Sequence, residues 1–179
     1  LSVSHGHLNL SPAVARAIDA AGSFWVSQLQ VQRSQALPQG LTLTANFSGQ
    51  IASRNLDSSQ QFYIGGPYGV MSYPVGDGGG DDGYLFTAKL SHPINLPRLP
   101  GALSGALLAQ TGSVWINHTP YAGAAGKNEL TESGVGVELD YAMARWTLSA
   151  AFAAQLGANS SPLVTTRRNQ AWFSVSYAF

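Results

Sequence analysis

The chain has 179 residues, a net charge of zero and only 10% charged residues, whereas a soluble domain usually carries about 25%. No stretch approaches the roughly 20 apolar residues of a membrane helix, and the lack of cysteine excludes disulfides and thiolate metal sites. The neutral charge balance argues against a nucleic-acid partner. The apolar residues are spread thinly along the chain, which fits the outer wall of a membrane barrel or a β-sandwich with an unusually uncharged surface.

The first predicted strand covers residues 2–10. It lacks the basic start and apolar run of a signal peptide, so we expect the beginning of the chain to be a processed end or a fragment boundary. His5 and His7 share one face of this strand, but no third ligand is evident, and we predict no metal site. Residues 12–20 have helical propensity and could form a short helix in a loop.

Strands predicted at 22–33 and 40–52 follow, and the second alternates clearly between apolar and polar positions. Its apolar positions are Leu41, Leu43, Ala45, Phe47 and Ile51, and the positions between them are Thr42, Thr44, Asn46, Ser48 and Gln50. A strand of this kind presents one face to lipid and the other to water.

A long loop is predicted over residues 55–82 and ends in a glycine-rich run at 76–83. This run lacks the Gly-Lys-Ser/Thr ending of a phosphate-binding loop. Its acidic spacing also differs from that of an EF-hand. We interpret it as the mobile return limb of the long loop.

The rest of the chain predicts strands at 83–92, 103–116, 129–141, 144–156 and 170–179. We expect a tight turn at Ala142 and Met143, with Val135, Val137, Leu139, Leu148, Ala150 and Phe152 facing lipid and Glu138 and Asp140 facing the lumen. Predicted strands of about 9–13 residues exceed the usual soluble length and suit a tilted membrane crossing. The long connections 55–82 and 157–169 contrast with this short turn. The sequence therefore predicts an all-β fold, a transmembrane antiparallel up-and-down β-barrel with about eight strands here.

The chain ends on an aromatic strand in which Phe173, Val175, Tyr177 and Phe179 share one face. This pattern resembles the β-signal by which the bacterial barrel-assembly machinery recognises its clients. The alternative is an ordinary edge strand, which would favour aggregation in a soluble protein. The β-signal interpretation implies that Phe179 is the true carboxy terminus.

The most specific stretch is residues 56–73, which begins Leu-Asp-Ser-Ser-Gln-Gln-Phe and continues through Gly65 and Gly66. It resembles the TpsB transporters of the Omp85 superfamily, which secrete and activate haemolysins, and the similarity is strongest over 49–90. The resemblance implies a barrel of sixteen strands, of which residues 1–179 supply the second half. It also implies a preceding pair of periplasmic POTRA domains outside this chain, and a long extracellular loop that folds into the pore.

The same resemblance places the loop tip at Val70, Met71, Ser72 and Tyr73, and the loop base at Gly65 and Gly66. The family has an arginine and a glycine where this chain has Met71 and Ser72, and its wall aspartate is replaced by Gln110, two residues before Gly112. Removing one partner of a buried ion pair costs about 3–5 kcal/mol, whereas replacing both is often nearly neutral. The loop is therefore expected to dock through Tyr73, apolar contact of Met71 and hydrogen bonds from Gln110.

The resemblance implies a pore in the bacterial outer membrane that translocates a partner exoprotein of haemolysin or adhesin type, without a cofactor. The other implied partners are outer-membrane lipid and, during biogenesis, the barrel-assembly machinery. Two alternatives stay open, an Omp85-type assembly or structural pore protein and a porin-like diffusion channel. No Ser/His/Asp or paired-carboxylate arrangement can be assembled from the sequence, so we expect no enzyme.

Overall fold

The structure is a computed structural model that describes residues 1–9, 20–121, 124, 126–157 and 168–179. Its main strands are β1 (Ser2–Leu8), β2 (Gly22–Ala36), β3 (Thr42–Ala52), β6 (Asp82–Ile94), β7 (Ala102–Trp115), β8 (Glu129–Met143), β9 (Trp146–Gln155) and β10 (Asn169–Tyr177). The smaller elements are β4 (Phe62–Tyr63), β5 (Gly79–Gly80) and the 3₁₀ turns η1 (Pro38–Gly40) and η2 (Ser58–Gln60). The helix predicted at 12–20 lies, except for Ala20, outside the described residues. Within the described ranges, no helix has the length and apolar character needed to span a membrane.

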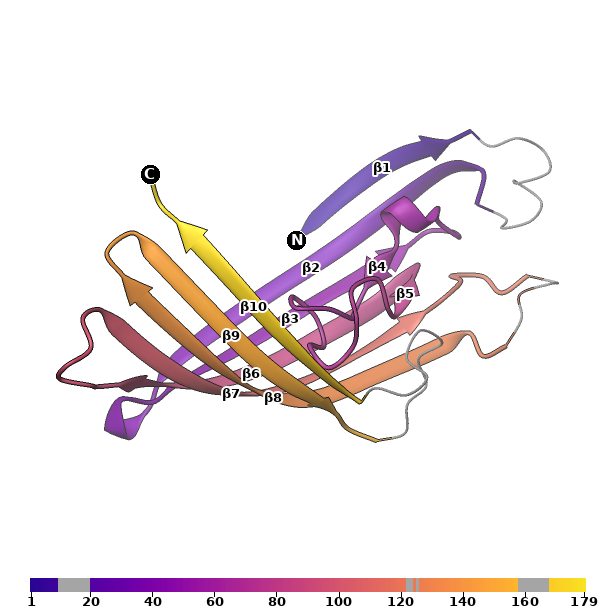
Figure 1. The fold of residues 1–179 in the computed structure, drawn as a ribbon. Helices are drawn as coiled ribbons and strands as arrows, with labels where there is room; N and C mark the ends of the chain where they lie inside the picture. Colours follow the sequence, from indigo (N-terminus) through magenta and orange to yellow (C-terminus); the bar gives the residue numbers. More distant parts are fainter. Residues whose placement is uncertain (10–19, 122–123, 125, 158–167) are drawn as a thin grey trace.

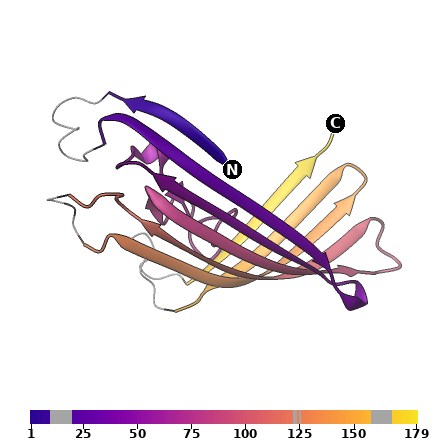
Figure 2. The same ribbon diagram turned by 180° about the vertical axis from the view of Figure 1, so that it is seen from behind.

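The main strands form one eight-stranded sheet in the order β1-β2-β3-β6-β7-β8-β9-β10, in which every neighbouring pair is antiparallel. Strand order therefore follows chain order, which confirms the predicted antiparallel up-and-down architecture. The sheet is curved into a trough, and β4 and β5 lie on its concave side together with the loop between them (Figures 1 and 2). The connections 37–41, 95–101 and 144–145 are short, whereas 53–81 and 116–128 are long.

The two faces of the sheet differ in polarity as the alternation predicts. In β8, Val135, Val137 and Leu139 are exposed on the convex face. Glu138 and Asp140 lie on the concave face, where both pair with Lys89 of β6. An apolar convex face suits contact with hydrocarbon, and a polar concave face suits a water-filled lumen. The sheet thus has the construction of a membrane-barrel wall.

The hairpin between β8 and β9 corrects one prediction. The turn lies at Ala144 and Arg145 rather than at Ala142 and Met143, because Met143 pairs with Trp146. β8 therefore runs two residues further than predicted, and β9 begins two residues later. Ala144 takes a positive φ of 52° to close this two-residue connection, and such turns usually require a positive φ. The sequence has no glycine or asparagine at these positions, so no residue type marks them as a turn.

We predict that single cysteines on β8 will differ in their access to water according to the face of the sheet on which they lie. Because the chain has no cysteine of its own, each introduced thiol is unique. Cysteines replacing Glu138 or Asp140 should react with a water-soluble thiol reagent in intact membranes, while Val135→Cys and Val137→Cys should stay unlabelled until detergent is added. Labelling of the valine positions without labelling of the carboxylate positions would contradict the membrane-barrel assignment.

Candidate functional site

The candidate site is the loop 53–81, which leaves β3 and returns to the sheet at β6. Near its start, the Asp57 side chain accepts a hydrogen bond from the Ser59 backbone N–H (3.1 Å) and thereby begins η2. That bond lowers the pKa of the Asp57 carboxyl. β4 then pairs with β5, which ties the outgoing and returning limbs together. The glycine-rich run is therefore part of a hydrogen-bonded element, unlike the mobile limb that the sequence predicted.

The tip of the loop is closed by backbone hydrogen bonds that only glycine permits. The Val70 N–H donates to the Ile64 carbonyl (2.6 Å), and the Gly69 N–H donates to the Gly66 carbonyl (3.0 Å). Gly66 has a φ of 108°, a conformation that side-chain-bearing residues rarely adopt. A Cβ on Gly65 would lie 2.6 Å from the Pro74 carbonyl oxygen. Gly65 and Gly66 thus lie within the tip turn, while β4 and β5 form the base of the loop.

The side chains of the tip are buried against the wall. Ile64, Val70, Ser72 and Tyr73 have no solvent exposure. Ile64 packs with Val114 of β7 and Leu130 of β8. Burial raises the pKa of the Tyr73 hydroxyl, and the nearby Glu132 carboxyl adds to this effect. The loop is accordingly packed inside the trough rather than extended into solvent.

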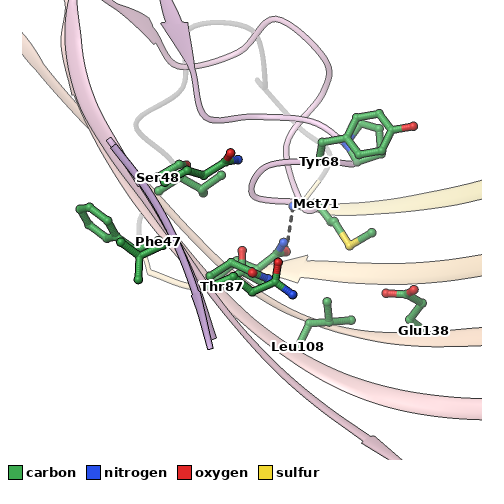
Figure 3. A pocket seen from close by; sticks show the side chains of 14 residues that line it. Phe47, Ser48, Tyr68, Met71, Thr87, Leu108 and Glu138 are labelled. Atoms are coloured by element: carbon green, nitrogen blue, oxygen red, sulfur yellow. Dashed lines mark hydrogen bonds between the residues drawn. The ribbon is translucent and has the colours of Figure 1, made fainter. Parts of the chain in front are cut away.

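Gln110 of β7 holds the tip backbone with both ends of its amide. Its Oε1 accepts a hydrogen bond from the Met71 N–H (3.0 Å), and its Nε2 donates to the Gly69 carbonyl. Figure 3 shows this bond from the Met71 amide, with Leu108 and Thr87 on the wall nearby. The structure thus brings together two positions that the sequence analysis paired, Met71 and Gln110, through the backbone of Met71 rather than its side chain.

Two other wall strands contact the tip through residues that the sequence analysis did not select. Gln155 of β9 donates from Nε2 to the Ser72 carbonyl (3.2 Å), and Trp172 of β10 donates from Nε1 to the Met71 carbonyl (2.7 Å). We call Gln110, Gln155 and Trp172 the amide cradle. Each contacts a backbone group of the loop, and none carries a charge. Gln155 and Trp172 fall between the outward positions of their strands, Phe152 in β9 and Phe173 in β10, and this alternation is the signal that could have found them.

The remaining predicted wall residue is Gly112, whose lack of a side chain lets Tyr84 of β6 and Ile64 of the loop approach β7 closely. A Cβ at this position would lie 2.8 Å from the Tyr84 carbonyl oxygen and 3.1 Å from the Ile64 side chain. A larger residue would therefore displace the loop. Beside the tip, a groove of about 430 Å³ is lined by amide and hydroxyl side chains, by a similar number of apolar side chains, and by Tyr68 and Glu138. Tyr68 is 97% exposed and lies across the groove from the wall (Figure 3).

The two limbs of the loop are fixed to the rim by Asp81, which is 1% exposed. Its carboxylate accepts hydrogen bonds from Gln61 Nε2 (3.0 Å) and the His118 backbone N–H (2.9 Å). Burial nevertheless raises the pKa of Asp81. In addition, Nε2 of Gln50 in β3 donates a hydrogen bond to the backbone carbonyl of Asp81 (3.1 Å). This contact joins the returning limb to the strand from which the loop departs.

The predicted β-signal residues lie at the end of the sheet. Phe173, Val175 and Tyr177 of β10 are exposed on the convex face, and Phe179, which follows β10, is also exposed. The Tyr177 ring lies 4.8 Å from the ring of Trp146 and 5.5 Å from that of Phe179, measured between centroids. These side chains form an aromatic cluster at the short-turn end of the barrel wall.

The two histidines near the start have local partners. The His5 ring lies 4.5 Å from the Trp25 ring, and His7 Nδ1 lies 3.0 Å from Ser23 Oγ. In the part of the chain that the structure describes, no three His, Cys, Asp or Glu side chains gather as a metal site would need.

Comparison with known proteins supports this fold. No family model matches the chain. Over 69 residues, or 38% of the chain, it is 30% identical to the heme/hemopexin transporter protein HuxB of Haemophilus influenzae, and this match covers 12% of HuxB. The solved structure of CdiB from Acinetobacter baumannii superposes on 87% of the chain with a TM-score of 0.63 and 21% identity, over 27% of the CdiB chain. The chain thus spans a small part of the length of both proteins, resembles TpsB transporters and shares the fold of CdiB.

Proposed function

We propose that the chain forms the second half of an outer-membrane pore that exports a partner protein by two-partner secretion. The observation that carries this proposal is the loop 53–81, which is docked inside a polar trough and held there by the amide cradle. The similarity to HuxB, a heme/hemopexin transporter protein, supports the same class of function.

The cradle suits a loop that must move when a polypeptide passes. Its contacts are hydrogen bonds between neutral groups, each contributing about 0.5–1.5 kcal/mol. A few such bonds hold the loop closed at rest, yet an entering chain can replace them with bonds of its own. The family's ion pair is absent, so release exposes no uncompensated charge at Met71 or Gln110. No cofactor and no covalent chemistry are part of the proposal, and we propose no enzymatic activity.

The terminal strand has a separate role in biogenesis. We propose that the exposed residues Phe173, Val175, Tyr177 and Phe179 form the signal read by the barrel-assembly machinery. Their exposure at the end of the sheet supports this role. The partner in export is an exoprotein of haemolysin or adhesin type, and the apolar face of the sheet contacts outer-membrane lipid.

Fixing the loop tests the proposed export. With cysteines at Met71 and Gln110, a short reducible thiol crosslinker should join loop and wall, because the Met71 N–H lies 3.0 Å from Gln110 Oε1. We expect crosslinking to reduce secretion of a co-expressed partner exoprotein to background, and reduction to restore it. A crosslink between Gln35→Cys and Leu43→Cys, which face each other across β2 and β3, is the matched control. Normal export with a fully crosslinked loop would refute the proposal and favour an assembly or diffusion role.

A further inference from the structure

Glu132 of β8 is a buried acid to which neither the fold nor the amide cradle assigns a role. Its side chain has no solvent exposure. Among the described residues, neither Oε1 nor Oε2 has a hydrogen-bond partner. Burying an ionised carboxylate without a partner is strongly unfavourable, whereas a protonated one is far less costly. A carboxyl group in this position therefore needs a proton or a bound cation.

The loop 53–81 is what covers this acid. A Cβ on Gly78 would lie 3.0 Å from Glu132 Oε1, so the loop backbone passes directly over the carboxyl group. The adjacent Asp77, 1% exposed, acts on Glu132 as a like charge. The same Cβ would lie 2.3 Å from the Ile64 side chain, so Ile64 and Glu132 together fill the space beside Gly78. Lifting the loop would return Glu132 to water, where an ionised carboxylate is stable.

The charged and titratable groups around Glu132 favour a proton over a cation. Asp77 and Tyr73 face it from the loop, and Glu132 lies opposite the uncharged Gly112 of β7. Arg168, before β10, acts on Tyr73, and its guanidinium donates to the Gly157 carbonyl. The described residues supply no third carboxylate or imidazole that would complete a metal site with Glu132 and Asp77.

We propose that Glu132 is a proton-dependent latch, which carries a proton while the loop 53–81 is docked and which releases the loop when it ionises. A carboxyl group that ionises more easily with the loop lifted makes docking weaker as pH rises. Docking begins to weaken once the pH exceeds the pKa of Glu132 in the undocked loop, which is that of an exposed glutamate, roughly 4.3. Docking is then strongest in acid and is lost progressively toward alkaline pH.

The latch depends on the docked loop of the proposed function, but its test reads the position of the loop and not export. Nitroxide labels at Tyr68→Cys and Gln35→Cys, both exposed positions, report the distance from the loop to the wall in outer-membrane vesicles. We expect one distance population near pH 5 and a second population that grows at least about tenfold by pH 9.5. Failed export with an intact pH response would refute the pore while leaving the latch in place.

Three variants separate the latch from general destabilisation. Glu132→Gln keeps the shape and removes the ionisation, so the loop should stay docked at every pH. Glu132→Asp keeps the acid and should retain the pH response. Asp77→Asn removes the facing charge and should leave a smaller released fraction at high pH. A response that is unchanged in Glu132→Gln would overturn the proposal. So would release that follows a divalent-cation chelator and is independent of pH.

Discussion

Replacing Gly69 with alanine is expected to undock the loop tip and leave the barrel wall intact. A Cβ at this position would lie 2.0 Å from the Ile64 carbonyl oxygen and 2.7 Å from its carbon. Both atoms belong to the backbone, so no side-chain rotation relieves the clash. The Ile64 carbonyl also accepts the bond from Val70 that closes the tip (2.6 Å). Overpacking of a tight site typically costs about 1–3 kcal/mol, and we expect the docked state to lose roughly 3 kcal/mol because this bond is lost as well.

Protease protection of the loop measures this effect. In Gly69→Ala, cleavage within residues 62–80 should become much faster, while the heat-modifiable mobility of the folded barrel stays unchanged. Gly49→Ala is the matched control, because a Cβ there would meet its nearest atom, the Gly83 carbonyl oxygen, at 3.4 Å, an ordinary contact. A loop in Gly69→Ala that remains as protected as in the unaltered protein would show that the tip turn does not control docking.

The strands could be predicted because each satisfies a local rule. Alternation in β3 and β8 fixes which face of the sheet is apolar, and a one-residue slip would move every side chain to the opposite face. The ends of the strands were less accessible, as Met143 shows, because pairing with Trp146 extends a ladder beyond the last clearly alternating residue. The pairing of β4 with β5 depends on two residues in each strand. Such short elements carry no periodic signal.

The site was predictable only in part because its contacts join distant segments. The resemblance identified Met71 and Gln110, which lie 39 residues apart in the chain. It said nothing of Trp172, which contacts Met71 from the last strand. Glu132 and Glu138 occupy equivalent positions in the alternation of β8, yet Glu138 pairs with Lys89 and Glu132 lies under the loop. Only the packed loop distinguishes these two glutamates.

Restoring the family's charged pair at Met71 and Gln110 should have opposite effects in single and double variants. Gln110 is a donor to the Gly69 carbonyl and an acceptor for the Met71 N–H. Gln110→Asp keeps an acceptor but loses the donor, and it places a negative charge beside a carbonyl oxygen. Met71→Arg places a positive charge in a partly enclosed groove opposite a neutral amide. Each single variant should weaken docking, since an unsatisfied buried polar group costs about 1–3 kcal/mol.

In the double variant, the new arginine and aspartate can pair, and loop protection should recover. We expect a coupling free energy of roughly 0.5–3 kcal/mol between the two positions, as found for residues in contact. Loop protection is to be measured at low and at high salt, because a partly exposed ion pair weakens as salt increases whereas the native amide contacts change little. Glu138→Gln in the Met71→Arg background controls for pairing of the new arginine with Glu138, which lines the same groove. Strictly additive effects of the two substitutions would mean that these two side chains do not meet in the docked loop.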